Sequence, residues 1–204
     1  MWAFILVVLV LFLIPGPAVL LTVTQTVRGG LKAGIVTGVG IAVGDLIHTV
    51  AAVLGLSAIL MTSALAFEVI KYLGAAYLIY LGIKSFLEKT KKQEKPVNKK
   101  VNTAMSFRQA LLIELLNPKT ALFFLAFLPQ FVVTDGPPVV FQLLTLGLIF
   151  VLMSIMYTSL LSFLASSLGN KLFSKESKMS RWQGKLVGTI YIGLGLQLVF
   201  QSQK

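Results

Sequence analysis

The chain contains no cysteine and a single histidine among its 204 residues. Without cysteine it can form neither a disulfide nor a thiolate metal site, and one histidine excludes a metal site built on several histidines of the same chain. Charge is also scarce, because Asp, Glu, Lys and Arg make up 12% of the residues, against about 25% in soluble domains. We therefore expect no metal, no other cofactor and no soluble globular fold.

Hydrophobic residues are abundant instead, at 56% of the chain with a mean hydropathy of +0.88. A helix of about 20 apolar residues spans the roughly 30 Å hydrocarbon core of a bilayer, and six apolar segments recur along the sequence. They are Trp2–Val27, Ile35–Met61, Phe67–Phe86, Phe107–Val133, Pro138–Leu168 and Gly184–Phe200. The first has no positively charged residues before it and runs past a proline pair, so we interpret it as an uncleaved span rather than a signal peptide. The sequence predicts an all-α integral membrane protein with six transmembrane helices.

Acidic residues are few, 7 against 18 basic ones, which gives a net charge of +11. The basic residues show no aromatic interleaving and no nucleic-acid-binding motif, so we expect no nucleic acid partner. Fifteen of the 18 lie in or beside the first, third and fifth connections between the apolar segments. Basic loops mark the cytoplasmic side of a membrane protein. We therefore expect these loops in the cytoplasm and both termini outside.

One polar connection, residues 87–106, is long enough to be a linker, and it divides a single membrane domain into residues 1–86 and 107–204. Each part holds three apolar segments. Because three is odd, two such repeats would have inverted orientations, a common design of secondary transporters. The first and fourth segments are interrupted at similar depths, by Pro15-Gly16-Pro17 and by Asn117-Pro118. We expect two inverted three-helix repeats whose first helices are broken.

Each break should release backbone polar groups. Proline removes one N–H donor from a helix, so Pro15 would free the carbonyl of Leu11 and Pro118 that of Glu114. Within a membrane, such backbone is tolerated where it packs in protein or lines a wet cavity. We expect the Pro15–Pro17 break to face a cavity opposite the Asn117–Pro118 break; a simple kink without function is the alternative.

Further candidate residues lie near these breaks. Asp45 is an intramembrane carboxylate, costly to insert, and is either a functional acid or a structural partner of Lys119. His48 lies three residues later on the same helical face and either relays protons or packs. Glu114 could hold a proton or a substrate ammonium, or face the cytoplasmic vestibule, and Asn117 could bind a zwitterion. Lys119 either binds a substrate carboxylate or neutralises Asp45.

Small residues repeat at four-residue spacing, which allows helices to approach closely. The pairs are Gly34/Gly38, Gly40/Gly44 and Gly184/Gly188. We assign them to helix packing.

The stretches "PGPAVLLTVTQTVRGGLKAGIVTGVGIAVGDLIHTVAAVLGL", "LGAAYLIYLGIKSF" and "LLNPKTALFFLAFLPQFV" together resemble the LysE/RhtB family of amino-acid exporters over most of the chain. The resemblance implies a non-enzymatic secondary transporter in the bacterial inner membrane. It would export amino acids or their derivatives from the cytoplasm and be driven by the proton motive force. By analogy a homodimer is a compatible assembly.

Two other functions compete with this one. A metal-ion exporter of related architecture would have to bind its cation with one histidine, no cysteine and few intramembrane acids. A membrane-embedded enzyme would lack a recognisable Ser/His/Asp arrangement. We therefore favour amino-acid export.

Overall fold

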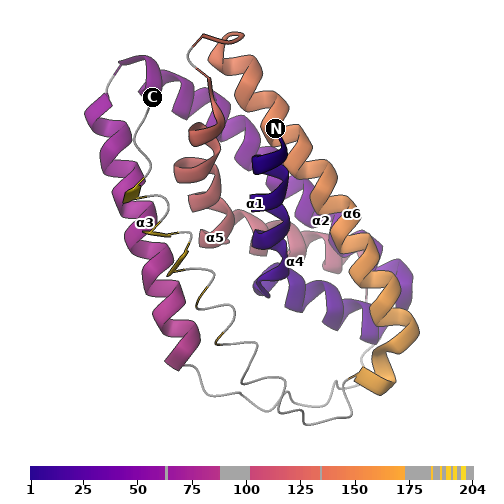
Figure 1. The fold of residues 1–204 in the computed structure, drawn as a ribbon. Helices are drawn as coiled ribbons and strands as arrows, with labels where there is room; N and C mark the ends of the chain where they lie inside the picture. The colour runs from indigo at the N-terminus through magenta and orange to yellow at the C-terminus, as the bar shows by residue number, and fades with distance from the viewer. Residues whose placement is uncertain are drawn as a thin grey trace.

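The computed structural model describes residues 1–62, 64–87, 102–133, 135–172 and single positions between 185 and 200. These residues form helices without a β-strand, as expected (Figure 1). In chain order the elements are α1 (Trp2–Leu13), α2 (Pro17–Thr62), α3 (Ala64–Leu87), α4 (Thr103–Leu115), α5 (Pro118–Leu122), the π-helical turn η1 (Phe123–Phe127), the 3₁₀ turn η2 (Leu128–Phe131) and α6 (Val139–Leu172). The linker residues 88–101 and most of the sixth expected segment, with its Gly184/Gly188 pair, lie outside the described residues.

The first expected segment is broken where the sequence predicts. α1 ends at Leu13, and Ile14 adopts extended angles of φ −78° and ψ 111°, because a residue before proline is pushed out of the helical region. Twelve residues give a helix about 18 Å long, which is shorter than the hydrocarbon core. Helix resumes at Pro17, a position where proline costs nothing since the first N–H of a helix lacks an acceptor anyway.

The expected loop between the first two segments is shorter than predicted. α2 continues through residues 28–34, and only Gly30 is non-helical, with φ 75° and ψ −177°. Glycine is the residue that adopts such a positive φ at little cost, so one residue suffices to change the helix direction. We call residues 17–29 the first leg of α2 and residues 31–62 the second leg.

The fourth expected segment is also broken as predicted, although it begins earlier than Phe107. The Asn102 side chain accepts hydrogen bonds from the N–H groups of Ala104 and Met105, at 3.0 and 3.5 Å, which starts α4 at Thr103. α4 ends before Asn117-Pro118, and the axis bends by 44° between Thr103–Leu115 and Pro118–Phe131.

Among the described residues, two stretches are each long and apolar enough to cross a membrane: Pro17–Gly55 within α2 and Val139–Ser167 within α6. The bent pair of α4 with α5, η1 and η2 gives a third, broken span, and α1 is a shorter apolar helix. These helices fit a membrane protein, while the count of six spans stays a prediction.

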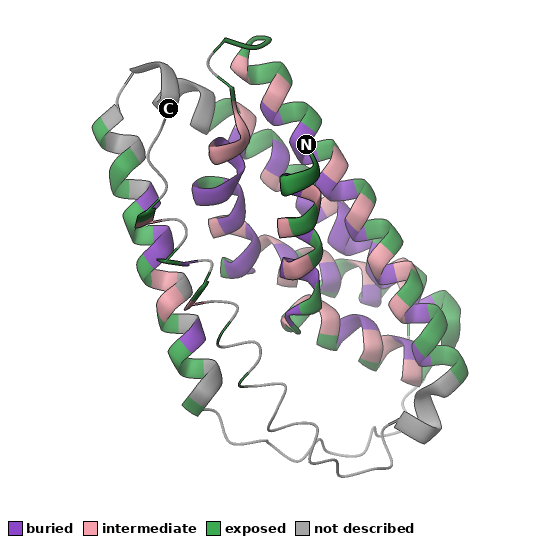
Figure 2. Cartoon of the chain, viewed as in Figure 1, coloured by how far each residue is buried: buried purple, intermediate pink, exposed green. Residues whose placement is uncertain are grey.

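The glycine pairs of α2 pack as predicted, and they face two different helices. A Cβ atom added to Gly38 would lie 2.7 Å from Thr158 Oγ1 of α6. One added to Gly44 would lie 2.7 Å from Glu114 Cβ of α4. Without side chains at these positions, α2 approaches α6 on one face and α4 on the other. Figure 2 shows the buried residues concentrated on the helices in the middle of the view, with many exposed residues on α3 and on the visible side of α6.

Candidate functional site

A small cavity lies where the two breaks meet. Its free volume is about 30 Å³, room for one or two water molecules. The lining combines residues beside both breaks with residues from the second leg of α2 and from α6. They are Leu11, Phe12, Gly16, Ala18, Val19, Ile41, Asp45, Glu114, Asn117, Lys119, Thr120, Phe150, Ser154, Tyr157 and Thr158. Pockets that hold small ligands are roughly 300 Å³ or larger, so in this conformation the cavity is too small to hold an amino acid.

The two breaks have the same local backbone geometry. Ile14 has φ −78° and ψ 111°, and Asn117 has φ −78° and ψ 105°. The N–H of Ile14 bonds to Leu11 O at 3.2 Å, and the N–H of Asn117 bonds to Glu114 O at 3.1 Å. In each break a proline follows immediately, so the carbonyl loses its usual donor four residues later.

Lys119 reaches from the second break to the first. Its Nζ donates to Leu11 O at 3.0 Å and to Ile14 O at 3.1 Å, and its side chain is 8% exposed. The carbonyl that Pro15 was predicted to free is therefore bonded by a buried ammonium group. This contact also places residues beside the two breaks against each other.

The second break carries its own polar network. The Asn117 side-chain oxygen accepts from the N–H of Lys119 at 3.1 Å and so caps α5. Its Nδ2 donates to both Glu114 carboxylate oxygens at 3.3 Å, and Thr120 Oγ1 donates to Glu114 Oε1. Glu114 is 2% exposed. It therefore lies inside the protein with donors on its carboxylate, and does not face a vestibule.

Asp45 differs from Glu114 in its hydrogen bonding. It is 1% exposed, and within the part of the chain that the structure describes neither carboxyl oxygen makes a hydrogen bond of good geometry, although the Ser154 hydroxyl and the Glu114 carboxyl lie beside it. Buried polar groups in native proteins are almost always paired, and an unpaired buried charge is costly. The cavity lining thus holds two carboxylic acids and one lysine, an excess of one acidic group.

Five of the nine candidate residues line this cavity: Gly16, Asp45, Glu114, Asn117 and Lys119. The other four are outside the lining. The side chains of Pro15, Pro17 and Pro118 are exposed, so the prolines shape the breaks without facing the cavity. His48 is half-buried, and its Nε2 lies 3.0 Å from Glu114 O while its ring stacks on Phe124 with centroids 5.9 Å apart.

Several lining residues were missed in the sequence. Ser154 and Thr158 lie on α6 at a spacing of four, and Ser162 continues the series. Hydroxyl groups repeated at this spacing within an apolar segment indicate a polar stripe on one helix face, and this signal could have identified them. Thr120 follows directly after Asn117-Pro118-Lys119 and gave no separate signal.

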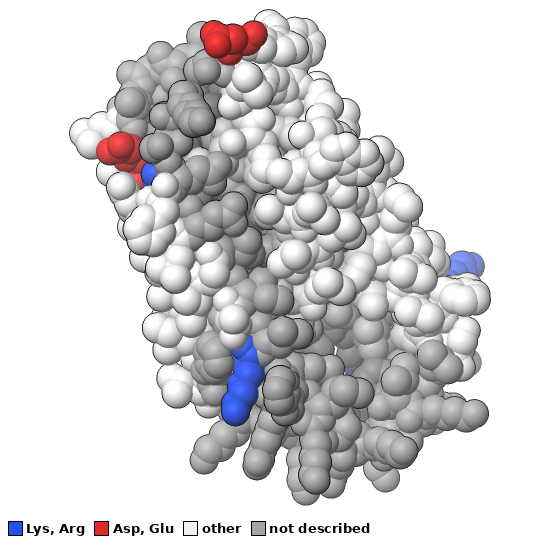
Figure 3. Space-filling model, in the orientation of Figure 1, with Lys and Arg blue, Asp and Glu red and all other residues white. Residues whose placement is uncertain are grey.

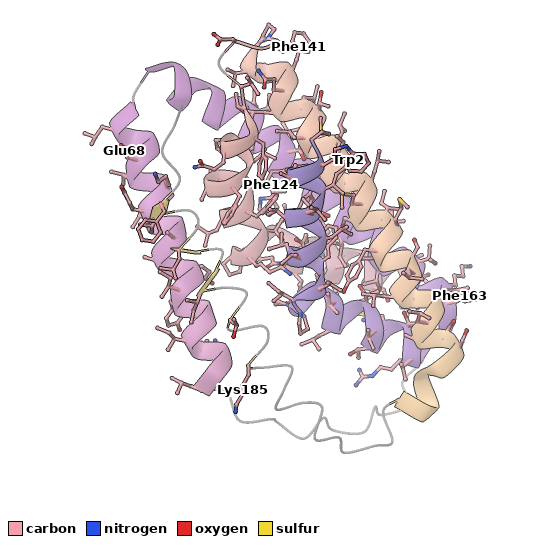
Figure 4. All side chains as sticks on the ribbon, viewed as in Figure 1. Trp2, Glu68, Phe124, Phe141, Phe163 and Lys185 are labelled. Carbon is pink, nitrogen blue, oxygen red and sulfur yellow. The ribbon has the colours of Figure 1, made fainter. Side chains whose placement is uncertain are left out.

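The described charges outside the cavity are only partly separated along the bundle, because Lys71 lies one helical turn from Glu68 on α3. Figure 3 shows the acidic side chains of this face near one end. Figure 4 places Glu68 toward that end and Lys185 toward the other, with Phe124 between them. Among the described residues, no three His, Asp or Glu side chains are grouped closely enough to share a metal ion.

Comparison with known proteins shows which family the sequence belongs to. The sequence model of LysE type translocators matches residues 9–202. The chain belongs to the LysE-type translocator family. An uncharacterized membrane protein of Bacillus subtilis strain 168, YrhP, is 36% identical to this translocator over 96% of each chain. An uncharacterized membrane protein of Pseudomonas aeruginosa is 31% identical, over 97% of this chain and 93% of that one.

A third relative carries a functional name. The leucine efflux protein of Salmonella typhimurium is 28% identical to this translocator, over 97% of this chain and 93% of that one. No solved structure matches the chain. Its family is one of membrane translocators and not of enzymes, and its apolar helices agree with that.

Proposed function

We propose that this translocator exports amino acids with neutral, apolar side chains from the bacterial cytoplasm, and that the proton motive force drives the export. The observation that carries the proposal is Asp45, a buried carboxyl group that lines the cavity beside Ser154 and Glu114 and makes no hydrogen bond of good geometry with the described residues. An ammonium group or a proton would each satisfy it. Occupancy by one would exclude the other, and this competition can couple substrate movement to proton movement.

The opposite end of a zwitterion also has complementary groups. The first leg of α2 begins at the break, and the first N–H groups of a helix have no acceptor within it. Ala18 and Val19 from this first turn line the cavity, and the positive end of the helix dipole favours a carboxylate there. The substrate would therefore lie with its carboxylate toward α2 and its ammonium toward Asp45.

The rest of the lining suits an apolar side chain. Leu11, Phe12, Val19, Ile41 and Phe150 contribute hydrocarbon surface, and the acidic and basic side chains of the lining are Asp45, Glu114 and Lys119. A cationic side chain would compete with the substrate ammonium for the acids. The name of the Salmonella relative, a leucine efflux protein, agrees with this preference.

The proposed architecture is two inverted repeats, residues 1–86 and 107–204, around this site. Their matched breaks support it, because the dihedral angles of Ile14 and Asn117 agree within a few degrees. The distribution of basic residues supports cytoplasmic loops and outward termini.

Single cysteines at Ser202 and at Lys95 test this orientation in a chain without native cysteine. An impermeant thiol reagent should label the first in intact cells and spare the second; the opposite labelling would reverse the transport direction.

The function itself is tested with purified protein in vesicles loaded with leucine. A proton entering at about 100 mV supplies roughly 2.3 kcal/mol, nearly a fiftyfold gradient. Imposing a proton gradient in the direction opposite to leucine movement should drive leucine against its concentration gradient, and collapsing it with an ionophore should stop uphill movement. Uphill movement that persists after collapse would contradict proton coupling. Absence of leucine, valine and isoleucine movement would contradict the substrate class.

A further inference from the structure

The carbonyl freed at each break is bonded by a side chain from the opposite half of the chain. Lys119, from the C-terminal half, donates to Leu11 O and Ile14 O. His48, from the N-terminal half, lies with Nε2 3.0 Å from Glu114 O. A carbonyl oxygen only accepts, so the His48 Nε2 carries the hydrogen in this contact. The two bonds cross between the halves.

Neither side chain is placed for the role that its chemistry suggests first. His48 is outside the cavity lining and lies between Glu114 O and the Phe124 ring. It therefore does not line the cavity in this conformation. Lys119 lines the cavity, but two of its three N–H donors are directed at backbone carbonyls of the first break.

We propose that His48 and Lys119 are reciprocal positioning residues. In the opposite half of the chain, each side chain donates a hydrogen bond to the carbonyl whose usual helical donor is replaced by proline. Together the two bonds fix the position of one break relative to the other. His48 fixes the backbone of Glu114 and thereby the carboxylate next to Asp45. Lys119 fixes Leu11 and Ile14 and thereby the N-terminus of the first leg of α2. The site that they position is the one in the proposed function, on which this inference rests.

The His48 bond is tested with two substitutions that differ in one property. His48→Gln places an amide N–H close to the position of Nε2 and cannot titrate. His48→Leu has similar bulk and no donor. With leucine-loaded vesicles, His48→Gln should transport within about twofold of the native rate and keep the native pH profile. His48→Leu should be slower by about fivefold, the effect of losing one net hydrogen bond of about 1 kcal/mol, because Glu114 O keeps the N–H of Asn117 as its other partner. Phe124→Leu is the matched control, because it removes the stacked ring and keeps the hydrogen bond; its rate should exceed that of His48→Leu.

Two results would overturn the inference for His48. If His48→Gln lost proton-driven uphill transport while keeping downhill transport, His48 would be a proton relay. If His48→Leu transported at the native rate with the native pH profile, the hydrogen bond would have no positioning role.

Lys119 is tested in the same way with Lys119→Arg, which keeps the charge and the donors, and Lys119→Met, which loses both. Lys119→Arg should restore most of the maximum rate lost in Lys119→Met, and the KM for leucine should rise in Lys119→Met alone, because only that variant releases the N-terminus of α2 that faces the substrate carboxylate. A KM that rises at least tenfold in both variants at an unchanged maximum rate would make Lys119 a substrate ligand instead.

Thermal unfolding of the purified proteins separates this inference from the proposed function. His48→Leu and Lys119→Met should each unfold several degrees below the native chain, since one net hydrogen bond of about 1 kcal/mol shifts the Tm by about 2–4 °C in a chain of this size. His48→Gln should unfold within about 1 °C of it, and Lys119→Arg should unfold above Lys119→Met but below the native chain, because its larger side chain overpacks the small cavity. If vesicles with the native protein move no leucine, the proposed function fails, but the unfolding temperatures still test whether His48 and Lys119 stabilise the two breaks. Equal unfolding temperatures for all four variants would show that they do not.

Discussion

The two helix breaks share one backbone geometry and differ in the groups that they present. The Pro15–Pro17 break has apolar neighbours, and neither Ile14 nor Gly16 has a polar side chain that could cap α2. The Asn117–Pro118 break is rich in polar side chains, and Asn117 caps α5 itself. The first break thus offers backbone N–H groups to the cavity, whereas the second offers a carboxylate and an ammonium. In the proposed function, the N–H groups at the first break would receive the substrate carboxylate, while Asp45 and the acid of the second break would lie toward its ammonium.

The largest expected effect concerns the two acids that face these breaks. Asp45→Asn keeps the size of the side chain and removes its titration. It should abolish proton-driven uphill leucine movement while the protein still inserts, because Asp45 lines the cavity and makes no hydrogen bond of good geometry with the described residues. Glu114→Gln should retain part of the proton-driven uphill leucine movement, because Asn117 and Thr120 already donate hydrogen bonds to Glu114. Normal pumping by Asp45→Asn combined with complete loss in Glu114→Gln would exchange their roles.

The next effect follows from making the first break resemble the second. Ile14→Asn would place a side-chain oxygen where it can accept from the N–H of Gly16, as Asn117 does from the N–H of Lys119. That oxygen would compete with a substrate carboxylate, so the KM for leucine should rise about tenfold, the value of one charge-assisted hydrogen bond. Thermal unfolding must accompany the measurement, since Ile14 is fully buried. A folded variant with an unchanged KM would remove the first break from the binding site.

A third prediction concerns the approach of α2 to the second break. Gly44→Ala adds a Cβ atom 2.7 Å from Glu114 Cβ, and such overpacking destabilises a core by about 1–3 kcal/mol. Gly55→Ala is the matched control on the same helix, because its added Cβ meets nothing within 4 Å. Gly44→Ala should unfold at a lower temperature than Gly55→Ala. Equal unfolding would show that α2 and α4 separate without cost.

The smallest effect is expected from the cap of the second break. Asn117→Ala leaves the N–H of Lys119 without the oxygen that it bonds, and loss of an N-cap costs about 1 kcal/mol. A fall in the Tm of about 2–4 °C is expected. Asn117→Ser keeps a capping oxygen and should recover part of the loss; no recovery would mean that the bonds from Asn117 Nδ2 to Glu114 dominate.

Features that depend on local covalent chemistry could be predicted from the sequence. Proline removes a donor wherever it lies, so both breaks and the freed carbonyls of Leu11 and Glu114 were expected. Glycine has no Cβ in any context, which identified Gly38 and Gly44 as contact positions. An isolated acid in an apolar segment identified Asp45. These predictions depend on the residue itself and not on its neighbours in space.

Features that depend on the opposite half of the chain could not be predicted. Lys119 bonds to Leu11 across 108 positions of sequence, and no helical periodicity relates two such residues. The same holds for His48, which the sequence placed on the face of Asp45 but could not place against Glu114. The loop expected around Gly30 was too long, because a single glycine with a positive φ turned the helix.

The glycine faces of α2 also decide how this helix can move. Gly38 and Gly44 lie against α6 and α4 without projecting side chains, and helices packed in this way can shear past one another by small displacements. Asp45 and His48 lie about one turn apart on the same leg of α2. A shift of α2 along its axis would therefore move the Asp45 carboxyl group out of the cavity and the His48 imidazole away from Glu114 at the same time. One axial shift of α2 would therefore both remove Asp45 from the site and release the backbone of the second break.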